Sequence, residues 1–167
     1  AVILTNADNG GPLIDEILGA IAAEYRWENW MPETPVQVAR VDPATNALVT
    51  RIPVPGAPVG AAFGFGSLWV STGDGHLVRI DPATNQVVAT IATQDSGGYV
   101  AVGGGAVWMT YPGHEGLADG KVTRVDPATN AVVASVTVGE GPAMVAVGAG
   151  SVWVGLYGAP TVIRVSS

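Results

Sequence analysis

The stretch Val41-Asp42-Pro43-Ala44-Thr45-Asn46 recurs twice in the chain, as Ile80-Asp81-Pro82-Ala83-Thr84-Asn85 and as Val125-Asp126-Pro127-Ala128-Thr129-Asn130. The copies are spaced by 39 and 45 residues. Three tryptophans recur at the same two spacings: Trp69, Trp108 and Trp153. Because two independent markers share one spacing pattern, the chain contains an internal repeat with a period of about 40 residues.

Each repeat is expected to hold four short β-strands. In the first complete copy they span about 58–63, 67–72, 76–81 and 86–92, separated by glycine-rich or Asp-Pro turns. Both faces of these strands are apolar, as in Leu68-Trp69-Val70, which is typical of a sheet covered on both sides by other sheets. Four strands with a period near 40 residues predict the blade of a β-propeller.

Incomplete blades flank the two complete ones. Two strands, about 36–41 and 47–53, precede them, and three strands ending near Val165 follow them. The expected fold class is therefore all-β: a partial β-propeller of about three four-stranded blades, with one N-terminal α-helix. The last blade lacks its fourth strand, and the incomplete first blade has a fourth strand to spare. A homodimer in which each copy gives this strand to the other would therefore close a ring of six blades. The third strand of the last blade is then present twice, and one copy, either 36–41 or 162–167, is displaced from the ring.

Composition and charge narrow the range of partners. The chain has 167 residues, of which 48% are hydrophobic and 13% charged, and its net charge is −7. The electrostatic field of a chain with this negative net charge repels phosphate groups, which argues against nucleic acid and anionic membranes as partners. The absence of cysteine excludes disulfides, thiolate zinc sites and cysteine nucleophiles. No apolar run is long enough to cross a bilayer and no signal peptide is visible, so a soluble chain is expected, with its compartment undecided.

Residues 1–33 differ from the remainder and are expected to form a strand-helix remnant and linker before the partial propeller at 34–167. They carry six acidic residues and one basic residue. A β-like run, Ala1-Val2-Ile3-Leu4, is followed by an amphipathic helix over 12–25 that begins with Pro12.

Two parts of the chain resemble known families. The unit Gly66-Ser67-Leu68-Trp69-Val70 with His76-Leu77-Val78-Arg79-Ile80-Asp81-Pro82-Ala83-Thr84-Asn85 resembles the blades of YVTN-type and virginiamycin B lyase-like (streptogramin lyase) propellers, over about 36–167. The lyase resemblance implies a histidine base and Mg²⁺ at the channel face. The segment Leu4-Thr5-Asn6-Ala7-Asp8-Asn9-Gly10-Gly11 with the following helix resembles the last strand and C-terminal helix of β-lactamase-type serine hydrolases, over about 1–31. The Ser-x-x-Lys and Tyr-x-Asn motifs of that hydrolase family do not occur in this sequence.

Residues that could carry chemistry concentrate at one end of the expected blades. In an up-and-down blade, the turn between the second and third strands lies at the same end as the crossover to the next blade. That end collects both histidines and five acidic residues: Asp74, His76, Asp95, His114, Glu115, Asp119 and Glu140. One of these turns is six residues longer than its equivalent, which makes 111–120 the first choice for a binding loop. The Asp-Pro turns lie at the opposite end, and turn geometry explains their residue types.

Residue type suggests a role for each candidate. His114 and His76 are the candidate catalytic residues, as general bases. The candidate substrate-binding residues are Tyr111, Glu115, Asp119, Asp74 and Tyr157. No cofactor is certain, and a divalent metal ion is one alternative. Its candidate ligands are His76, His114, Asp95 and Glu140.

Three functions follow from this arrangement. The first is a homo-oligomerising propeller whose loop face binds a small molecule at the central channel. The alternative is a hydrolase of small esters, lactones or phosphotriesters that uses the histidines and carboxylates at the channel mouth. The third is a lyase that resembles streptogramin lyase. Whether the chain is an enzyme stays open, and hydrolysis is favoured over elimination if it is one.

Overall fold

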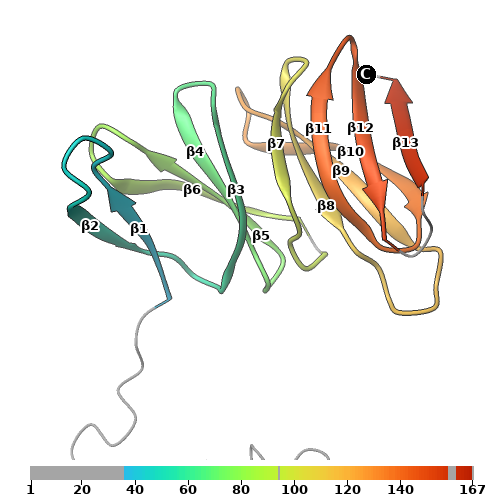
Figure 1. Ribbon diagram of the computed structural model, residues 1–167, viewed down its shortest axis with the longest axis horizontal. Helices are drawn as coiled ribbons and strands as arrows, with labels where there is room; N and C mark the ends of the chain where they lie inside the picture. The colour runs from blue at the N-terminus through green and yellow to red at the C-terminus, as the bar shows by residue number, and fades with distance from the viewer. Residues whose placement is uncertain (1–35, 94, 158–160, 167) are drawn as a thin grey trace, which may run out of the picture. The chain divides into compact units, whose positions relative to one another are not determined.

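The computed structural model describes residues 36–93, 95–157 and 161–166, which form thirteen β-strands in four antiparallel sheets (Figure 1). The first sheet pairs β1 (Gln37–Val41) with β2 (Leu48–Pro53). The second sheet contains β3 (Pro58–Gly64), β4 (Ser67–Thr72), β5 (His76–Asp81) and β6 (Gln86–Ala92). The third contains β7 (Val100–Gly103), β8 (Ala106–Tyr111), β9 (Gly120–Asp126) and β10 (Ala131–Gly139). The fourth contains β11 (Pro142–Gly148), β12 (Ser151–Leu156) and β13 (Thr161–Ser166).

The all-β class and the expected division into strands are confirmed. Strands β4, β5 and β6 occupy the expected residues, and β3 runs one residue beyond its expected end. The two-stranded and three-stranded sheets stand where incomplete blades are expected. The described residues contain no helix, so none in this part of the chain is long and apolar enough to cross a membrane. The helix expected over 12–25 lies outside the described residues, as does the whole of 1–33, and the domain boundary stays a prediction.

The three Asp-Pro turns share one conformation. The Asp42 carboxylate accepts a hydrogen bond from the backbone N–H of Ala44 at 2.8 Å, and the later copies repeat this contact at 2.9 Å. The asparagine that closes each turn is left-handed, with φ of 56° at Asn46, 58° at Asn85 and 54° at Asn130. Asparagine adopts this conformation more readily than most residues that carry a side chain. Local chemistry therefore determines each turn, and with it the pairing of the strands on either side.

Apolar side chains fill the spaces between successive sheets. Alternate residues of a strand point to opposite faces, so Trp69 packs toward the third sheet whereas Val70 packs toward the first. The space between the second and third sheets is filled by Trp69, Leu77, Ile91, Val107, Met109 and Val125. Equivalent clusters fill the other two spaces, and the strands β3, β7 and β11 contact one another in series. The second and third sheets are thus packed on both faces, whereas the first and last sheets are packed on one.

The three repeated tryptophans occupy equivalent positions but are covered to different extents. In each case the indole N–H donates to the carbonyl oxygen five residues earlier, at 3.0 to 3.1 Å. The exposed fraction is 0% for Trp69, 3% for Trp108 and 39% for Trp153. The following sheet covers Trp69 and Trp108, whereas no sheet follows β11–β13 among the described residues. The last sheet therefore presents an uncovered apolar face.

Two arginines connect the first sheet to the second and the second sheet to the third. Arg40 donates to the carbonyl oxygen of Pro82 and to Oδ1 of Asn85, both at 2.7 Å. Arg79 makes the equivalent pair of contacts with the turn of the third sheet, at 2.9 and 3.1 Å. The residue types of the Asp-Pro turns predict only a reversal of the chain. In the structure the second and third of these turns also accept hydrogen bonds from an arginine of the preceding sheet.

The substitution Leu77→Ala tests the packing between the second and third sheets. Leu77 is fully buried, so its truncation should lower the free energy of unfolding by about 2–5 kcal/mol. Leu117→Ala is the matched control, because Leu117 is exposed and its loss should cost less than about 0.5 kcal/mol. Urea unfolding followed by tryptophan fluorescence measures both changes. Equal costs for the two variants would contradict this packing.

Candidate functional site

Loops of neighbouring sheets meet at one end of the described structure. The backbone N–H of Gly97, in the crossover to the third sheet, donates to the carbonyl oxygen of Thr72 at the end of β4, at 2.9 Å. The N–H of Gly141, in the next crossover, donates to the carbonyl oxygen of Pro112 after β8, at 3.1 Å. The crossovers and the turns between second and third strands therefore lie together, as the blade topology predicts. This end holds the candidate site.

The longer loop, between β8 and β9, is closed by Asp119. One carboxylate oxygen accepts the backbone N–H of His114 at 2.9 Å, and the other lies 2.7 Å from Nδ1 of the same histidine. Gly113 permits this approach, because it has a φ of 82° and a Cβ there would lie 2.4 Å from the Asp119 carboxylate. The buried Tyr111 places its ring edge-on to His114, with its hydroxyl 3.4 Å from Nδ1. Three predicted site residues thus form one cluster.

This cluster has the electrostatics of an oriented base. The hydrogen bond with the His114 side chain lowers the pKa of the Asp119 carboxyl, and the backbone N–H of His114 adds to the effect. Asp119 is therefore charged at neutral pH and orients the imidazole through Nδ1. An imidazole held in this way presents Nε2 for proton transfer, as in enzymes that pair a histidine base with an orienting carboxylate. The His114 side chain is exposed, so a ligand can approach from solvent.

His76 and Asp74 form a second pair, at the turn between β4 and β5. Nδ1 of His76 lies 3.2 Å from a carboxylate oxygen of Asp74. The Thr72 hydroxyl donates to the other oxygen at 2.5 Å; it is the main cause of the lowered pKa of Asp74, to which His76 adds. The structure therefore gives each histidine its own aspartate.

The two remaining candidate ligands have other partners. Asp95 pairs with Nζ of Lys121 at 3.2 Å, and Glu140 accepts the backbone N–H of Gly116 at 3.1 Å. Lys121 also lies over the Tyr111 ring, 5.5 Å from its centroid. The role of Lys121 beside the site was missed from the sequence. Two features of the sequence could have pointed to it: Lys121 is the only lysine of the chain, and it comes just after the long loop.

A metal centre does not assemble from the candidate ligands alone. Nowhere in the described part of the chain do three or more histidine, aspartate and glutamate side chains gather to hold a metal ion. His114 with Asp119 offers two donors, and His76 with Asp74 offers two more. Catalytic metal sites commonly use three protein ligands. A divalent ion stays a prediction and would need further donors from water or from the ligand.

The last two predicted binding residues are exposed. Glu115 lies in the same loop as His114, and Tyr157 lies just after β12, with 75% of its surface exposed. The backbone N–H of Tyr157 donates to the carbonyl oxygen of Gly141 at 3.0 Å, which brings this residue to the loop end. Both side chains are therefore accessible to a ligand, and neither lies within the Tyr111–His114–Asp119 cluster.

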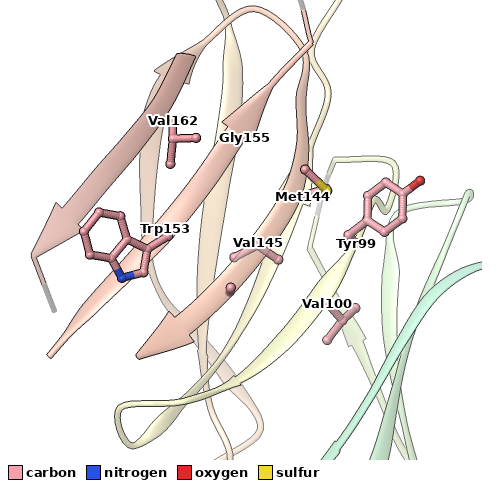
Figure 2. A pocket seen from close by; sticks show the side chains of 8 residues that line it. Tyr99, Val100, Met144, Val145, Trp153, Gly155 and Val162 are labelled. Carbon is pink, nitrogen blue, oxygen red and sulfur yellow. The ribbon is translucent and has the colours of Figure 1, made fainter. Parts of the chain in front are cut away.

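An apolar groove of about 520 Å³ runs over the uncovered face of the last sheet (Figure 2). It is lined by Tyr99, Val100, Met144, Val145, Ala146, Trp153, Gly155 and Val162. In the second and third sheets the equivalent face is covered by the next sheet, as the burial of Trp69 and Trp108 shows. The groove is therefore an uncovered sheet face rather than a preformed ligand pocket.

Comparison with known proteins gives structural relatives only. No protein-family model matches the chain, and no curated protein matches it. Hydrazine synthase from Kuenenia stuttgartiensis superposes with a TM-score of 0.70 and 17% identity, over 78% of this chain and 40% of that chain. The dihydro-heme d1 dehydrogenase NirN gives 0.58 and 13%, over 75% and 29%. The computationally designed Ika4 protein gives 0.64 and 15%, over 78% and 79%.

These relatives establish the fold class and nothing finer. Hydrazine synthase and NirN are β-propeller proteins, and with the four antiparallel sheets they define this chain as an all-β protein of propeller-like fold. The chain spans about two fifths of the hydrazine synthase chain and under a third of the NirN chain. A shared propeller fold carries no particular activity. Kinship with YVTN-type or virginiamycin B lyase-like blades stays a prediction.

The pKa of Asp119 tests the geometry of the cluster. Its carboxyl should titrate below the ordinary value of 3.8. Because the pKa is lowered in the folded chain, the His114–Asp119 contact stabilises the loop above that value and is lost as pH falls through the lowered pKa. Carboxyl NMR titration should show the midpoint rising toward 3.8 in His114→Ala, while that of Asp74 stays unchanged. An unmoved Asp119 midpoint in the variant would contradict the cluster.

Proposed function

We propose that the chain assembles as a two-fold homodimer that closes a propeller ring, and that the loop end of this ring binds a small ligand. The proposal rests on the unequal burial of the three equivalent tryptophans. Trp153 is 39% exposed where its equivalents Trp69 and Trp108 are 0% and 3% exposed. A further sheet against β11–β13 would remove this difference and shield apolar surface from water.

The opposite end of the row of sheets offers a matching apolar surface. Exposed apolar side chains on β1 and β2 include Val41, Leu48 and Val49. On the last sheet they include Met144, Trp153 and Val162. If β2 of each copy joins β11–β13 of the other as the outermost strand of one blade, the second sheet of the incoming copy would cover the Trp153 face. The third sheet of the receiving copy would cover the exposed apolar face of the incoming β2, and a two-fold axis would repeat both contacts in one closed assembly. Two copies with one strand each displaced would supply six four-stranded blades.

Ring closure would also build the ligand site. The His114–Asp119 and His76–Asp74 pairs lie on loops at one end of the sheets. With a two-fold axis along the channel, both copies present this end on the same face. The channel mouth is then lined by histidines and carboxylates from two chains, which suits a small polar ligand.

The substitution Trp153→Glu tests the association. Light scattering on a size-exclusion column should give the wild-type chain a mass near twice 16.9 kDa. A carboxylate in the uncovered face should give a monomer, because burying an unpaired charge is strongly unfavourable. Val133→Glu is the control, since Val133 is an exposed residue of β10 outside this face. A monomeric wild-type chain would refute the proposal.

A hydrolase of small esters, lactones or phosphotriesters is the second candidate function, and the His114–Asp119 pair favours it. A carboxylate 2.7 Å from Nδ1 orients the imidazole, and the exposed Nε2 can remove a proton from an attacking water. The Tyr111 hydroxyl, 3.4 Å from Nδ1, borders the same cluster. A streptogramin lyase-like elimination would use the same base, so the same variants test it.

Turnover of p-nitrophenyl acetate tests the hydrolase. If His114 is the base, His114→Ala should lower kcat by about 100-fold or more. Leu117→Ala is the matched control in the same loop, because Leu117 is exposed and has no role in the proposed site, and it should leave the rate unchanged. A rate that EDTA also lowers would indicate a metal-bound water. Equal rates for wild type and His114→Ala would remove His114 from the mechanism, and His76→Ala applies the same test to the second pair.

A further inference from the structure

The contacts from arginine to the Asp-Pro turns form a series that has one donor left over. Arg40 in β1 and Arg79 in β5 each donate to the turn of the next sheet. Arg124 in β9 is the third member of the series. It pairs in register with Trp108 as Arg79 pairs with Trp69, and its guanidinium lies over the indole, 5.7 Å from the ring centroid. The indole therefore supports this side chain as it does in the preceding sheet.

Arg124 has no hydrogen-bond acceptor among the described residues. Its Nε is buried and unpaired, because Ala106 stands where the other sheets have a serine that accepts this N–H, Ser67 for Arg79 and Ser151 for Arg164. The turn that its terminal N–H groups would reach comes after β13, and the described residues hold no such turn. A buried donor without an acceptor costs free energy. Binding of a partner that supplies an acceptor to Arg124 is therefore favourable.

The Asp-Pro turn between β1 and β2 has two hydrogen-bond acceptors without donors. Arg79 uses the carbonyl oxygen of Pro127 and Oδ1 of Asn130, and the same two groups in the first turn belong to Pro43 and Asn46. Neither of these acceptors has a donor within the described ranges, and both residues are exposed. Asn46 has a φ of 56°, against 54° at Asn130, so the free turn already has the conformation that an arginine recognises elsewhere in the chain.

We propose that Arg124 of one copy donates to the carbonyl oxygen of Pro43 and to Oδ1 of Asn46 in a second copy. The inference rests on the proposed two-fold assembly and names the polar contact that sets its register. When β2 of the second copy becomes the outermost strand of the last sheet, its preceding turn reaches the place that Arg124 faces. The planar guanidinium suits two acceptors at once, which a lysine ammonium does not reproduce. A two-fold dimer contains this contact twice.

A double-mutant cycle on the dimer dissociation constant tests the contact. Sedimentation equilibrium of the full chain should show Arg124→Ala weakening the dimer by about tenfold per contact, and so about a hundredfold in all. Asn46→Gly removes Oδ1 while keeping the left-handed turn, and should weaken the dimer by a smaller factor. The double variant should be no weaker than Arg124→Ala alone, since both changes remove the same contact. Arg79→Ala with Asn46→Gly is the matched control and should be additive, because Arg79 uses acceptors within its own chain.

The outcomes separate the contact from the assembly. A monomeric wild-type chain overturns the proposed function and the contact with it. A dimer in which the effects of Arg124→Ala and Asn46→Gly simply add overturns the contact alone. Should Arg124→Ala fail to fold, Arg124→Lys keeps the charge over Trp108 but loses the paired donors, and the dimer should still weaken. An unchanged dissociation constant for both Arg124→Lys and Asn46→Gly refutes the contact.

Discussion

The rest of the structure depends on one constraint: each sheet has two apolar faces and is stable only when both are covered. In β4, Trp69 points to one neighbouring sheet and Val70 to the other. Strand pairing inside a sheet cannot meet this demand, because it satisfies the backbone and leaves both faces in water. Every sheet in the row therefore needs two neighbours, and the face at Trp153 is uncovered because no sheet packs on it among the described residues.

Polar contacts give this apolar stacking its register. Side chains that pack by area alone tolerate sliding, whereas a guanidinium that must meet a carbonyl and an amide oxygen does not. Arg40 and Arg79 meet such a pair at 2.7 to 3.1 Å, and each is placed by the strand that also carries the apolar core residues. Because the same turn both reverses the chain and receives the arginine, one short motif links local folding to the packing between sheets.

The loop end is where the repeated sheets differ most in the residues they carry. The sheets differ little in their cores, but the loop after β8 is longer and carries the Tyr111–His114–Asp119 cluster. Glycine at position 113, with its left-handed φ, lets the loop fold back until Asp119 meets His114. The framework holds these residues at a fixed end of the sheet, and the residue types there depend on the loop, which is why structural likeness to other propellers carries no activity.

Sequence by itself determined the strands and the end at which the loops lie, because short apolar runs and the glycine-rich or Asp-Pro turns between them act over a few residues. Strands β4, β5 and β6 were predicted to the residue on this basis. It also brought His114, Asp119 and Tyr111 into one loop, since they are close in the chain. Only the tertiary structure decided that Asp95 meets Lys121, that Arg79 meets the turn of the next sheet, and that Trp153 stays exposed. The first two contacts join residues that are 26 and 48 positions apart in the chain, and the exposure of Trp153 depends on whether another sheet covers it. All three are set by how whole sheets are placed relative to one another.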